Sequence, residues 1–256
     1  MREILVIGIG AGDPEHVTVG AVRALNGVDV FFVVEKPGER DQLVALRREI
    51  CRRYIKDQSY RVVSVPDPQR DRSDPAYREA VEDWRRRRTD VWERLISEEL
   101  GQDECGAFLV WGDPSLYDST LAIIDSIRDR GAVAFEHRVI PGITSVQALT
   151  AQHRITLNRV GGAVQIMPGR LLRDGWPDGV DDLVVMLDAD AAFRAVAGED
   201  AEIYWGAYVG CEDELLVSGP LTAEVMDEIE RARAAARERK GWIMDVYLLR
   251  RRPPVG

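Results

Sequence analysis

The chain is organised around the stretch Phe108-Leu109-Val110-Trp111-Gly112-Asp113-Pro114-Ser115-Leu116-Tyr117. Residues 107–111 have the continuous apolar character of a buried strand, and a helical pattern follows over residues 119–130. The strand stops abruptly at Gly112-Asp113-Pro114. Ligands of open α/β sheets bind outside the carboxyl ends of the strands, so this strand-to-helix transition predicts a binding site for a small molecule.

The first strand of the chain ends in the same tripeptide. Residues 3–9 form an apolar run typical of a strand covered on both faces, and the run leads into Gly8-Ile9-Gly10-Ala11-Gly12-Asp13-Pro14. A helix is predicted to begin near Thr18 and to stop at Asn26-Gly27, before a second buried strand over residues 28–34. Two Gly-Asp-Pro turns at strand ends of one sheet can face one cleft.

The pattern changes character along the chain, which predicts a boundary between domains 1–141 and 142–256. The first domain contains a long helix that is predicted to start near Ser73 and to end near Leu100. Its run Arg85 to Arg88 is interpreted as a solvated helix face, with a patch for phosphate or carboxylate as the alternative. In the second domain helices are fewer, so hairpins or mixed pairing are expected among strands at residues 164–167, 183–187, 202–209 and 243–249.

Composition bounds the possible partners of this chain of 256 residues. The net charge of −10 disfavours nucleic acid as the main partner, although a local basic patch for a small anion can still form. The three cysteines and three histidines are scattered, which argues against a disulfide framework and a dedicated metal site. No apolar run is long enough for a membrane span and the N-terminus lacks the pattern of a signal peptide, so a cytoplasmic protein is expected.

Taken alone, Gly8-Ile9-Gly10-Ala11-Gly12 suggests the dinucleotide fingerprint G-x-G-x-x-G. The third glycine comes one residue early, however, and Asp13 stands where a pyrophosphate would meet the helix. A nicotinamide-dependent oxidoreductase is therefore a weak alternative. A second alternative is that Asp13 and Asp113 only cap the turns that follow them.

Three spaced motifs together carry more weight than one. Gly8-Ile9-Gly10-Ala11-Gly12-Asp13-Pro14, Trp111-Gly112-Asp113-Pro114-Ser115-Leu116-Tyr117 and Val139-Ile140-Pro141-Gly142-Ile143-Thr144-Ser145 occur in this order. With them the chain resembles the tetrapyrrole (corrin/porphyrin) methylases over nearly its whole length. The resemblance implies two α/β domains with the cofactor cleft between them, S-adenosylmethionine as the cofactor, a small-molecule tetrapyrrole substrate and a homodimer.

Further segments resemble one subgroup of that family, at residues 21–26, 41–51, 66–72, 109–120 and 153–159. The subgroup transfers a methyl group to C-1 of precorrin-5 and releases the C-20 acetyl group as acetate. The helix near residues 73–100 is an insertion relative to shorter members and agrees with this subgroup. A sister methylase acting at another corrin carbon or on diphthamide is the main alternative. A binding module without enzymatic activity is disfavoured by the paired strand-end loops.

The resemblance also implies which residues form the site. Residues near the cofactor are Ala11, Gly112, Asp113, Leu116, Thr144, Ser145, Leu187 and Ala207. Leu187 is expected beside the adenine, and plain core packing is the alternative for Leu187 and Ala207. Tyr117 is the candidate for activating the water that removes the acetyl group, with Glu212 and Asp213 as further candidates. Arginines suit the carboxylates of the substrate, and Arg154 and Arg159, with Arg170 and Arg173 nearby, are the candidates, ordinary surface arginine being the alternative.

Overall fold

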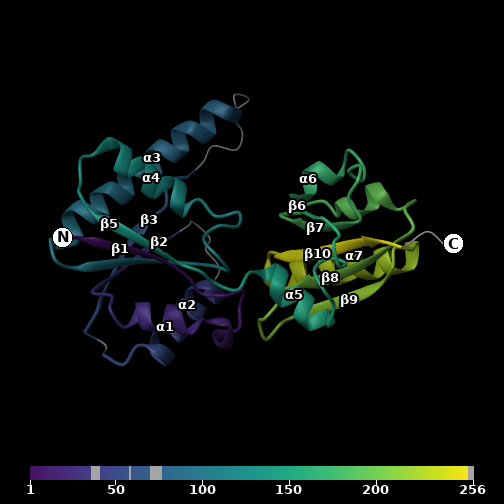
Figure 1. The fold of residues 1–256 in the computed structure, drawn as a ribbon, viewed down its shortest axis with the longest axis horizontal. Helices are drawn as coiled ribbons and strands as arrows, with labels where there is room; N and C mark the ends of the chain where they lie inside the picture. Colours follow the sequence, from purple (N-terminus) through teal and green to yellow (C-terminus); the bar gives the residue numbers. More distant parts are fainter. Residues whose placement is uncertain (36–40, 58, 70–76, 253–256) are drawn as a thin grey trace. The chain divides into compact units, whose positions relative to one another are not determined.

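The computed structural model of the chain describes residues 1–35, 41–57, 59–69 and 77–252 (Figure 1). It divides into two compact units, Met1–Thr144 and Ser145–Gly256, whereas the sequence placed the boundary between residues 141 and 142. Each unit is built on its own five-stranded sheet, which confirms the prediction of two α/β domains. No helix in the described ranges is long and apolar enough to span a bilayer.

The sheet of the N-terminal unit has the strand order β3-β2-β4-β1-β5, and all its strands are parallel. Its strands are β1 (Glu3–Gly8), β2 (Val30–Glu35), β3 (Arg61–Pro66), β4 (Cys105–Val110) and β5 (Glu136–Ile140). In the dinucleotide-binding fold β1 lies next to β2, but here β4 separates them. This strand order contradicts the alternative of a nicotinamide-dependent oxidoreductase built on the dinucleotide-binding fold.

Helices cover both faces of this sheet. Helices α1 (Val19–Leu25) and α2 (Asp41–Tyr54) lie on one face, and α3 (Tyr77–Glu99) and α4 (Thr120–Arg130) on the other (Figure 1). Alternate residues of β1 enter the two cores: Ile4 and Val6 pack with α3 and α4, while Leu5 and Ile7 pack with α1 and α2. Burying one such side chain is worth about 1.5–3 kcal/mol, and this two-sided burial explains why the strand is apolar throughout.

The predicted ends of α1 are confirmed. The Thr18 side chain accepts a hydrogen bond from the amide of Ala21 at 3.0 Å, and Asn26 forms the C-cap. For α3, the predicted start near Ser73 lies outside the described residues, while the helix ends at Glu99 as expected.

The arginine run of α3 is not uniformly a solvated face. Arg86 and Arg87 are exposed and pair with Asp83 one turn earlier. Arg88 is buried instead, and its guanidinium lies 4.8 Å from the ring centroid of Trp84. The interpretation of this run as a solvated helix face was therefore wrong for Arg88. Its hydrogen-bonding partners, which anchor it, are distant in the sequence, so the local pattern does not show its burial.

Those anchors lie in two other segments of the N-terminal unit. The guanidinium of Arg88 donates to the carboxylate of Asp67 at 2.8 Å, directly after β3, and to the hydroxyl of Ser119 at 2.7 Å, at the start of α4. It also lies 5.5 Å from the ring centroid of Trp92. Arg88 thus connects the helical insertion to the end of the loop between β4 and α4, residues 111–119, which we call the central loop.

The C-terminal unit contains a mixed sheet with the order β6-β7-β10-β8-β9. Its strands are β6 (Val164–Pro168), β7 (Asp182–Met186), β8 (Ala201–Ala207), β9 (Leu215–Pro220) and β10 (Asp245–Arg251). Only β6 and β7 pair in parallel, so the prediction of mixed pairing is confirmed. The sequence did not reveal β9, an edge strand whose residues are alternately exposed and half-buried.

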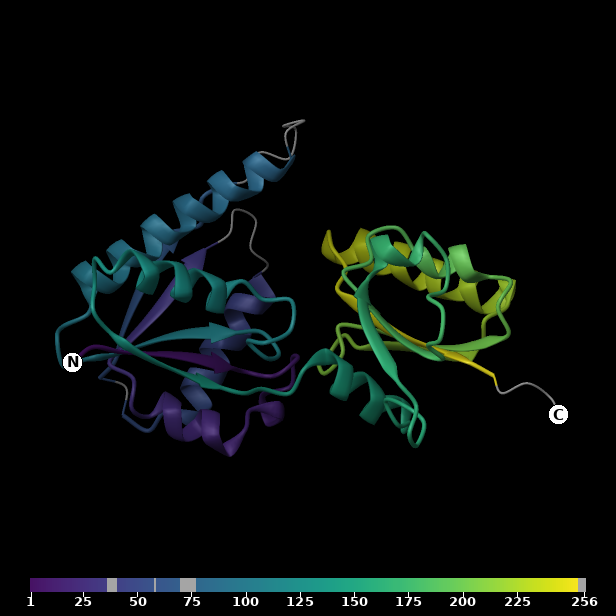
Figure 2. The same cartoon turned by 45° about the horizontal axis from the view of Figure 1, so that its top comes forward.

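Helices cover both faces of the second sheet as well. Helix α5 (Ser145–His153) contacts β8 and β10 on one face, and α7 (Ala223–Lys240) packs on the other, with α6 (Gly169–Leu172) and the 3-10 turn η2 (Ala192–Val196) (Figure 2). Helix α7 ends at Gly241, whose φ of +72° gives the left-handed C-cap that glycine favours.

Candidate functional site

A backbone bridge joins the central loop to the loop that follows β1, residues 9–13, which we call the first loop. The amide of Gly112 donates to the carbonyl oxygen of Gly10 at 2.8 Å, and the amide of Gly10 donates back at 3.3 Å. Both glycines have a positive φ, +83° and +69°, a conformation that costs glycine little. The loops that carry the two Gly-Asp-Pro turns are therefore in direct contact through their glycines.

The third motif packs onto this bridge through its own glycine. A Cβ atom on Gly142 would overlap the carbonyl oxygen of Gly112, and one on Gly8 would lie 2.6 Å from the amide nitrogen of Gly142. No side chain fits at either position. The three motifs thus form one loop cluster, held by backbone packed on backbone.

Asp113 connects two of these loops. One oxygen of its carboxylate accepts the amide of Gly142 at 2.8 Å, and the other accepts the amide and hydroxyl of Ser115. Burial raises the pKa of Asp113, but the hydrogen bonds from Ser115 and Gly142 lower it more, so its pKa lies below the ordinary value. Asp13, by contrast, caps only its own turn by accepting the amide of Glu15 at 2.8 Å.

Two polar atoms at the loop cluster are buried without a hydrogen-bond partner. Of the four such side-chain atoms in the part of the chain that the structure describes, His16 Nδ1 and Trp111 Nε1 belong here. His16 packs against Gly10, and Trp111 precedes Gly112. Buried polar atoms are ordinarily paired, so these two nitrogens fit a site that receives a polar ligand. Neither nitrogen could be identified from the sequence, because burial at a loop is not visible in a local pattern.

The other predicted cofactor residues of this unit lie in the same cluster. Ala11 is buried in the first loop, Leu116 is half-buried in the central loop, and Thr144 has its Cα 3.7 Å from a Cβ built on Gly112. Tyr117 is 45% exposed, and its φ of +52° is strained for a residue with a side chain.

The remaining cofactor candidates belong to the C-terminal unit, where Ser145 begins α5. Leu187 directly follows β7 and Ala207 ends β8; both strands pair with β10, which places the two residues at one end of the sheet. Leu187 is 65% exposed with a φ of +52°, so core packing does not explain it. Ala207 is fully buried in the core of this unit, as the alternative of plain core packing expects.

The predicted substrate arginines lie elsewhere in the C-terminal unit. The guanidinium of Arg159 donates to the carbonyl oxygen of Arg251 and lies 3.5 Å from Asp181, while its amide bonds to Asp182. Asp182 begins β7 and Leu187 follows its end, so at about 3.3 Å per residue they are separated by more than about 13 Å. The structure therefore does not bring Arg159 together with Leu187 and Ala207.

The other candidates for substrate or water are less constrained by geometry. Arg154 is exposed and follows the C-terminus of α5. Asp213 forms ion pairs with Arg239 and Lys240 at the end of α7, which disfavours it as a base, and Glu212 is exposed. Within the described ranges, no group of three His, Cys, Asp or Glu side chains is arranged to hold a metal ion.

The structure thus has two α/β units and a glycine-built loop cluster at the carboxyl ends of β1 and β4, where ligands of α/β sheets bind. The chain belongs to the Tetrapyrrole (Corrin/Porphyrin) Methylases, whose family model matches residues 3–224. The family predicted from the three motifs is thereby confirmed.

Individual relatives narrow the comparison. A protein from Sinorhizobium sp named Precorrin-6A synthase [deacetylating] is 51% identical over 251 residues, which cover 98% of this chain and 96% of that protein. A structure from Corynebacterium diphtheriae described as related to cobalamin synthesis (CobF) is 37% identical, with a TM-score of 0.85 and coverage of 98% and 99%. A uroporphyrin-III C-methyltransferase from Thermus thermophilus, complexed with S-adenosylhomocysteine, shares the fold at 18% identity and a TM-score of 0.56, with coverage of 96% and 91%.

Proposed function

We propose that this chain is an S-adenosylmethionine-dependent methyltransferase that methylates precorrin-5 at C-1 and releases the C-20 acetyl group as acetate, giving precorrin-6A. The observation that carries the proposal is the 51% identity, over 98% of the chain, to the Sinorhizobium protein of that name. The CobF structure supports it through its match to 98% of this chain.

The loop cluster suits a cationic cofactor. Glycine backbones allow a ligand to approach the main chain of Gly112, and the buried nitrogens of His16 and Trp111 offer hydrogen-bonding capacity. Like an ordinary aspartate, Asp113 is ionised at neutral pH, and its negative charge favours a positive ligand and disfavours a dinucleotide phosphate. When bound, S-adenosylmethionine supplies an electrophilic methyl group on a sulfonium.

The residues proposed to hold this cofactor are the eight that the family resemblance implies. They are Ala11, Gly112, Asp113, Leu116 and Thr144 from the loop cluster, and Ser145, Leu187 and Ala207 from the C-terminal unit. The exposed side chain of Leu187 provides an apolar face for the adenine ring. The protein's contribution to methyl transfer is then chiefly positioning, because ring carbons of a reduced corrin are already enamine-like nucleophiles.

Loss of the acetyl group makes a second demand on the protein. Water must add to the acetyl carbonyl carbon and lose a proton, and the bond to C-20 breaks with its electron pair passing into the macrocycle. That pair replaces the electrons that the macrocycle gave to the new C-1–methyl bond, so no oxidant or reductant is required. We assign the water-orienting role to Tyr117, which lies exposed in the central loop. Arg154 and Arg159 keep only a peripheral role toward substrate carboxylates.

One incubation tests the proposal. The purified protein is mixed with precorrin-5 and methyl-labelled S-adenosylmethionine, and both the labelled corrinoid and free acetate are quantified. One acetate per methyl group supports the assignment. Methylation without acetate would make the chain a sister methylase acting at another corrin carbon. Binding of S-adenosylhomocysteine without turnover of precorrin-5 would support the family alone.

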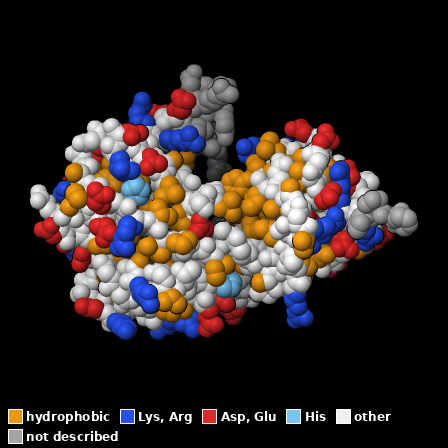
Figure 3. All heavy atoms as spheres, in the orientation of Figure 1, with side chains coloured by type: hydrophobic (Ala, Val, Ile, Leu, Met, Phe, Trp, Pro, Cys, Tyr) orange, Lys and Arg blue, Asp and Glu red, His pale blue; other side chains and the backbone are white. Residues whose placement is uncertain are grey.

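We further propose that the protein is a cytoplasmic homodimer without a nucleic-acid partner. The family resemblance supports the dimer, which light scattering coupled to size-exclusion chromatography tests. Cys51, Cys105 and Cys211 are not joined by disulfide bonds, as expected in a reducing compartment. On the face drawn in Figure 3, acidic and basic side chains are interspersed rather than gathered into a basic patch.

A further inference from the structure

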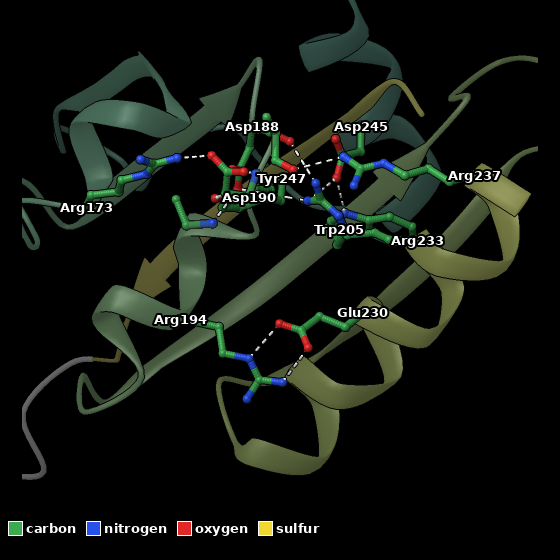
Figure 4. A network of polar contacts seen from close by, with 12 residues as sticks. Arg173, Asp188, Asp190, Arg194, Trp205, Glu230, Arg233, Arg237, Asp245 and Tyr247 are labelled. Atoms are coloured by element: carbon green, nitrogen blue, oxygen red, sulfur yellow. Dashed lines mark hydrogen bonds and ion pairs between the residues drawn. The ribbon is translucent and has the colours of Figure 1, made fainter. Parts of the chain in front are cut away.

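A buried polar network lies at the end of the C-terminal sheet where Leu187 and Ala207 are found (Figure 4). Asp188 directly follows Leu187, Arg233 comes from α7, and Asp245 begins β10. The side chains of these three charged residues are at most 5% exposed. Charges removed from water in this way are tolerated only when they are paired and hydrogen-bonded.

Arg233 links the two strand ends directly. Its guanidinium donates to the carboxylate of Asp245 at 2.7 Å and to the main-chain carbonyl oxygen of Asp188 at 2.7 Å. The indole of Trp205 donates to the same oxygen of Asp245 at 2.9 Å, which connects β8, two residues before Ala207.

Asp188 is held through its side chain as well. One carboxylate oxygen accepts the amide of Ala192 at 2.7 Å and the hydroxyl of Tyr247 at 2.7 Å, and the other accepts the amide of Asp190 at 3.0 Å. Gly169 leaves no room on the remaining side, since a Cβ there would lie 2.7 Å from the Cβ of Asp188. Asp188 is therefore fixed at its carbonyl, its carboxylate and its Cβ.

Leu187 is the residue on which this fixation acts. It lies between Met186, which is paired with Val246 in the β7–β10 ladder, and the immobilised Asp188. A left-handed backbone conformation at a leucine is strained and persists only when the surrounding structure holds it in place. The network around Asp188 holds it on the C-terminal side of Leu187. The result is a large apolar side chain presented to solvent from a rigid strand end.

We propose that Arg233, Asp188, Asp245 and Tyr247 are positioning residues that hold Leu187 in the conformation that receives the adenine ring of the cofactor. This inference rests on the proposed function. Stability alone is a weak reason for such a network, because apolar residues of similar volume often replace a buried ion pair at no loss of stability. Directed hydrogen bonds, unlike apolar contacts, hold the end of β7 in one defined position.

The test measures the affinity of the full-length protein for S-adenosylhomocysteine by calorimetry, well below the melting temperature of each variant. For Arg233→Met we expect the Kd to rise about tenfold, and for Leu187→Ala about tenfold as well. Because Arg233 acts through Leu187, the double variant should also lose about tenfold rather than about a hundredfold, since residues acting through one element are not additive. Arg233→Lys, which can bridge only one of the two acceptors, should lie between wild type and Arg233→Met.

Arg194→Met is the matched control. Arg194 lies in η2 and pairs with Asp227 and Glu230, which belong to α7 as Arg233 does. It makes none of the contacts described for the network around Asp188. It should leave the Kd within about twofold, as expected for a half-exposed ion pair. In turnover with precorrin-5, Arg233→Met should raise the KM for S-adenosylmethionine while kcat stays within about threefold, since ground-state binding is what is lost.

Each outcome decides between explanations. If Arg233→Met does not fold, Tyr247→Phe removes a single hydroxyl and should still raise the Kd about threefold. Wild-type affinity in these variants, an additive double variant, or an equal loss in Arg194→Met would overturn the positioning role while leaving the proposed function intact. No binding by the wild-type protein would overturn both.

Discussion

The replacement of Asp113 by alanine is the sharpest probe of the loop cluster, because Asp13 provides a natural control in the same Gly-Asp-Pro context. Asp113→Ala removes acceptors for two backbone amides, of Gly142 and Ser115, whereas Asp13→Ala removes one, for Glu15. A hydrogen bond to a charged group is worth about 1.5–3 kcal/mol. The lower value applies to the bond between Ser115 and Asp113, because that turn faces solvent. We expect Asp113→Ala to lower the free energy of unfolding by about 3 kcal/mol, against about 1 kcal/mol for Asp13→Ala, which loses a cap alone.

The pH dependence of this difference provides an internal check. The folded-state pKa of Asp113 lies below its unfolded value, so its stabilisation is fully present above the ordinary value of about 3.9 and is lost as the pH falls through the folded pKa. The gap between wild type and Asp113→Ala should therefore be constant from pH 8 to about pH 5 and shrink at lower pH. Urea unfolding at several pH values measures it.

Binding is the second readout for the same pair of variants. Because the bond from Asp113 to Gly142 is the one that joins two loops, Asp113→Ala should weaken S-adenosylhomocysteine binding at least about tenfold more than Asp13→Ala. If calorimetry gave the two variants equal affinity and urea unfolding gave them equal stability, the role assigned to this cross-loop bond would have to be abandoned.

Three further substitutions or measurements follow from the same structure. Gly142→Ala should lower the free energy of unfolding by at least about 3 kcal/mol, because the new Cβ would overlap a carbonyl oxygen. Gly198 has open space around it, so Gly198→Ala should stay within about 1 kcal/mol of wild type. Similar values for the two variants in urea unfolding would contradict the packing. Arg88→Ala leaves the buried carboxylate of Asp67 unpaired and should lower the free energy of unfolding by about 3–5 kcal/mol. The exposed Arg86 is the control, and Arg86→Ala should lower it by about 0.5 kcal/mol. Equal melting temperatures for the two variants would refute the role of the buried pair. Burial raises the pKa of Cys51 to about 11, so its thiol should resist a thiol reagent at pH 8 until the chain unfolds. Since its unfolded pKa is lower, at about 8.5, its contribution to stability should decline as the pH rises above that value, and rapid labelling of native protein would contradict the burial.

Local pattern was sufficient wherever neighbours in sequence are neighbours in space. The apolar run of β1, the start of α1 near Thr18 and its stop at Asn26 were all predicted, because each depends on residues within one or two turns. The order of the strands was not predictable in this way, since nothing local places β4 between β1 and β2. The edge strand β9 escaped for a related reason, as its half-buried residues gain their partner only from β8.

The buried charges mark the limit of the sequence for the site. Arg88 lies in a run of four arginines, yet it alone is buried, because its partners Asp67 and Ser119 are 21 and 31 residues away. Arg233 and the carbonyl of Asp188 are 45 residues apart, and α7 reads as an ordinary charged helix. Long-range pairing of this kind decides which charge is solvated and which is structural, and no single-sequence pattern contains it.

The two Gly-Asp-Pro turns show why one motif is a poor guide and three together are a good one. In sequence Asp13 and Asp113 are equivalent, and each caps the turn that follows it. They differ because Gly142 lies opposite Asp113, where a residue with a side chain would not fit against Gly112. The third motif thus converts one of two equal caps into a bond between loops. The glycines of all three motifs constrain one another sterically, so they must occur together, and their joint occurrence in order is a physical signature of this loop cluster rather than of glycine-rich turns in general.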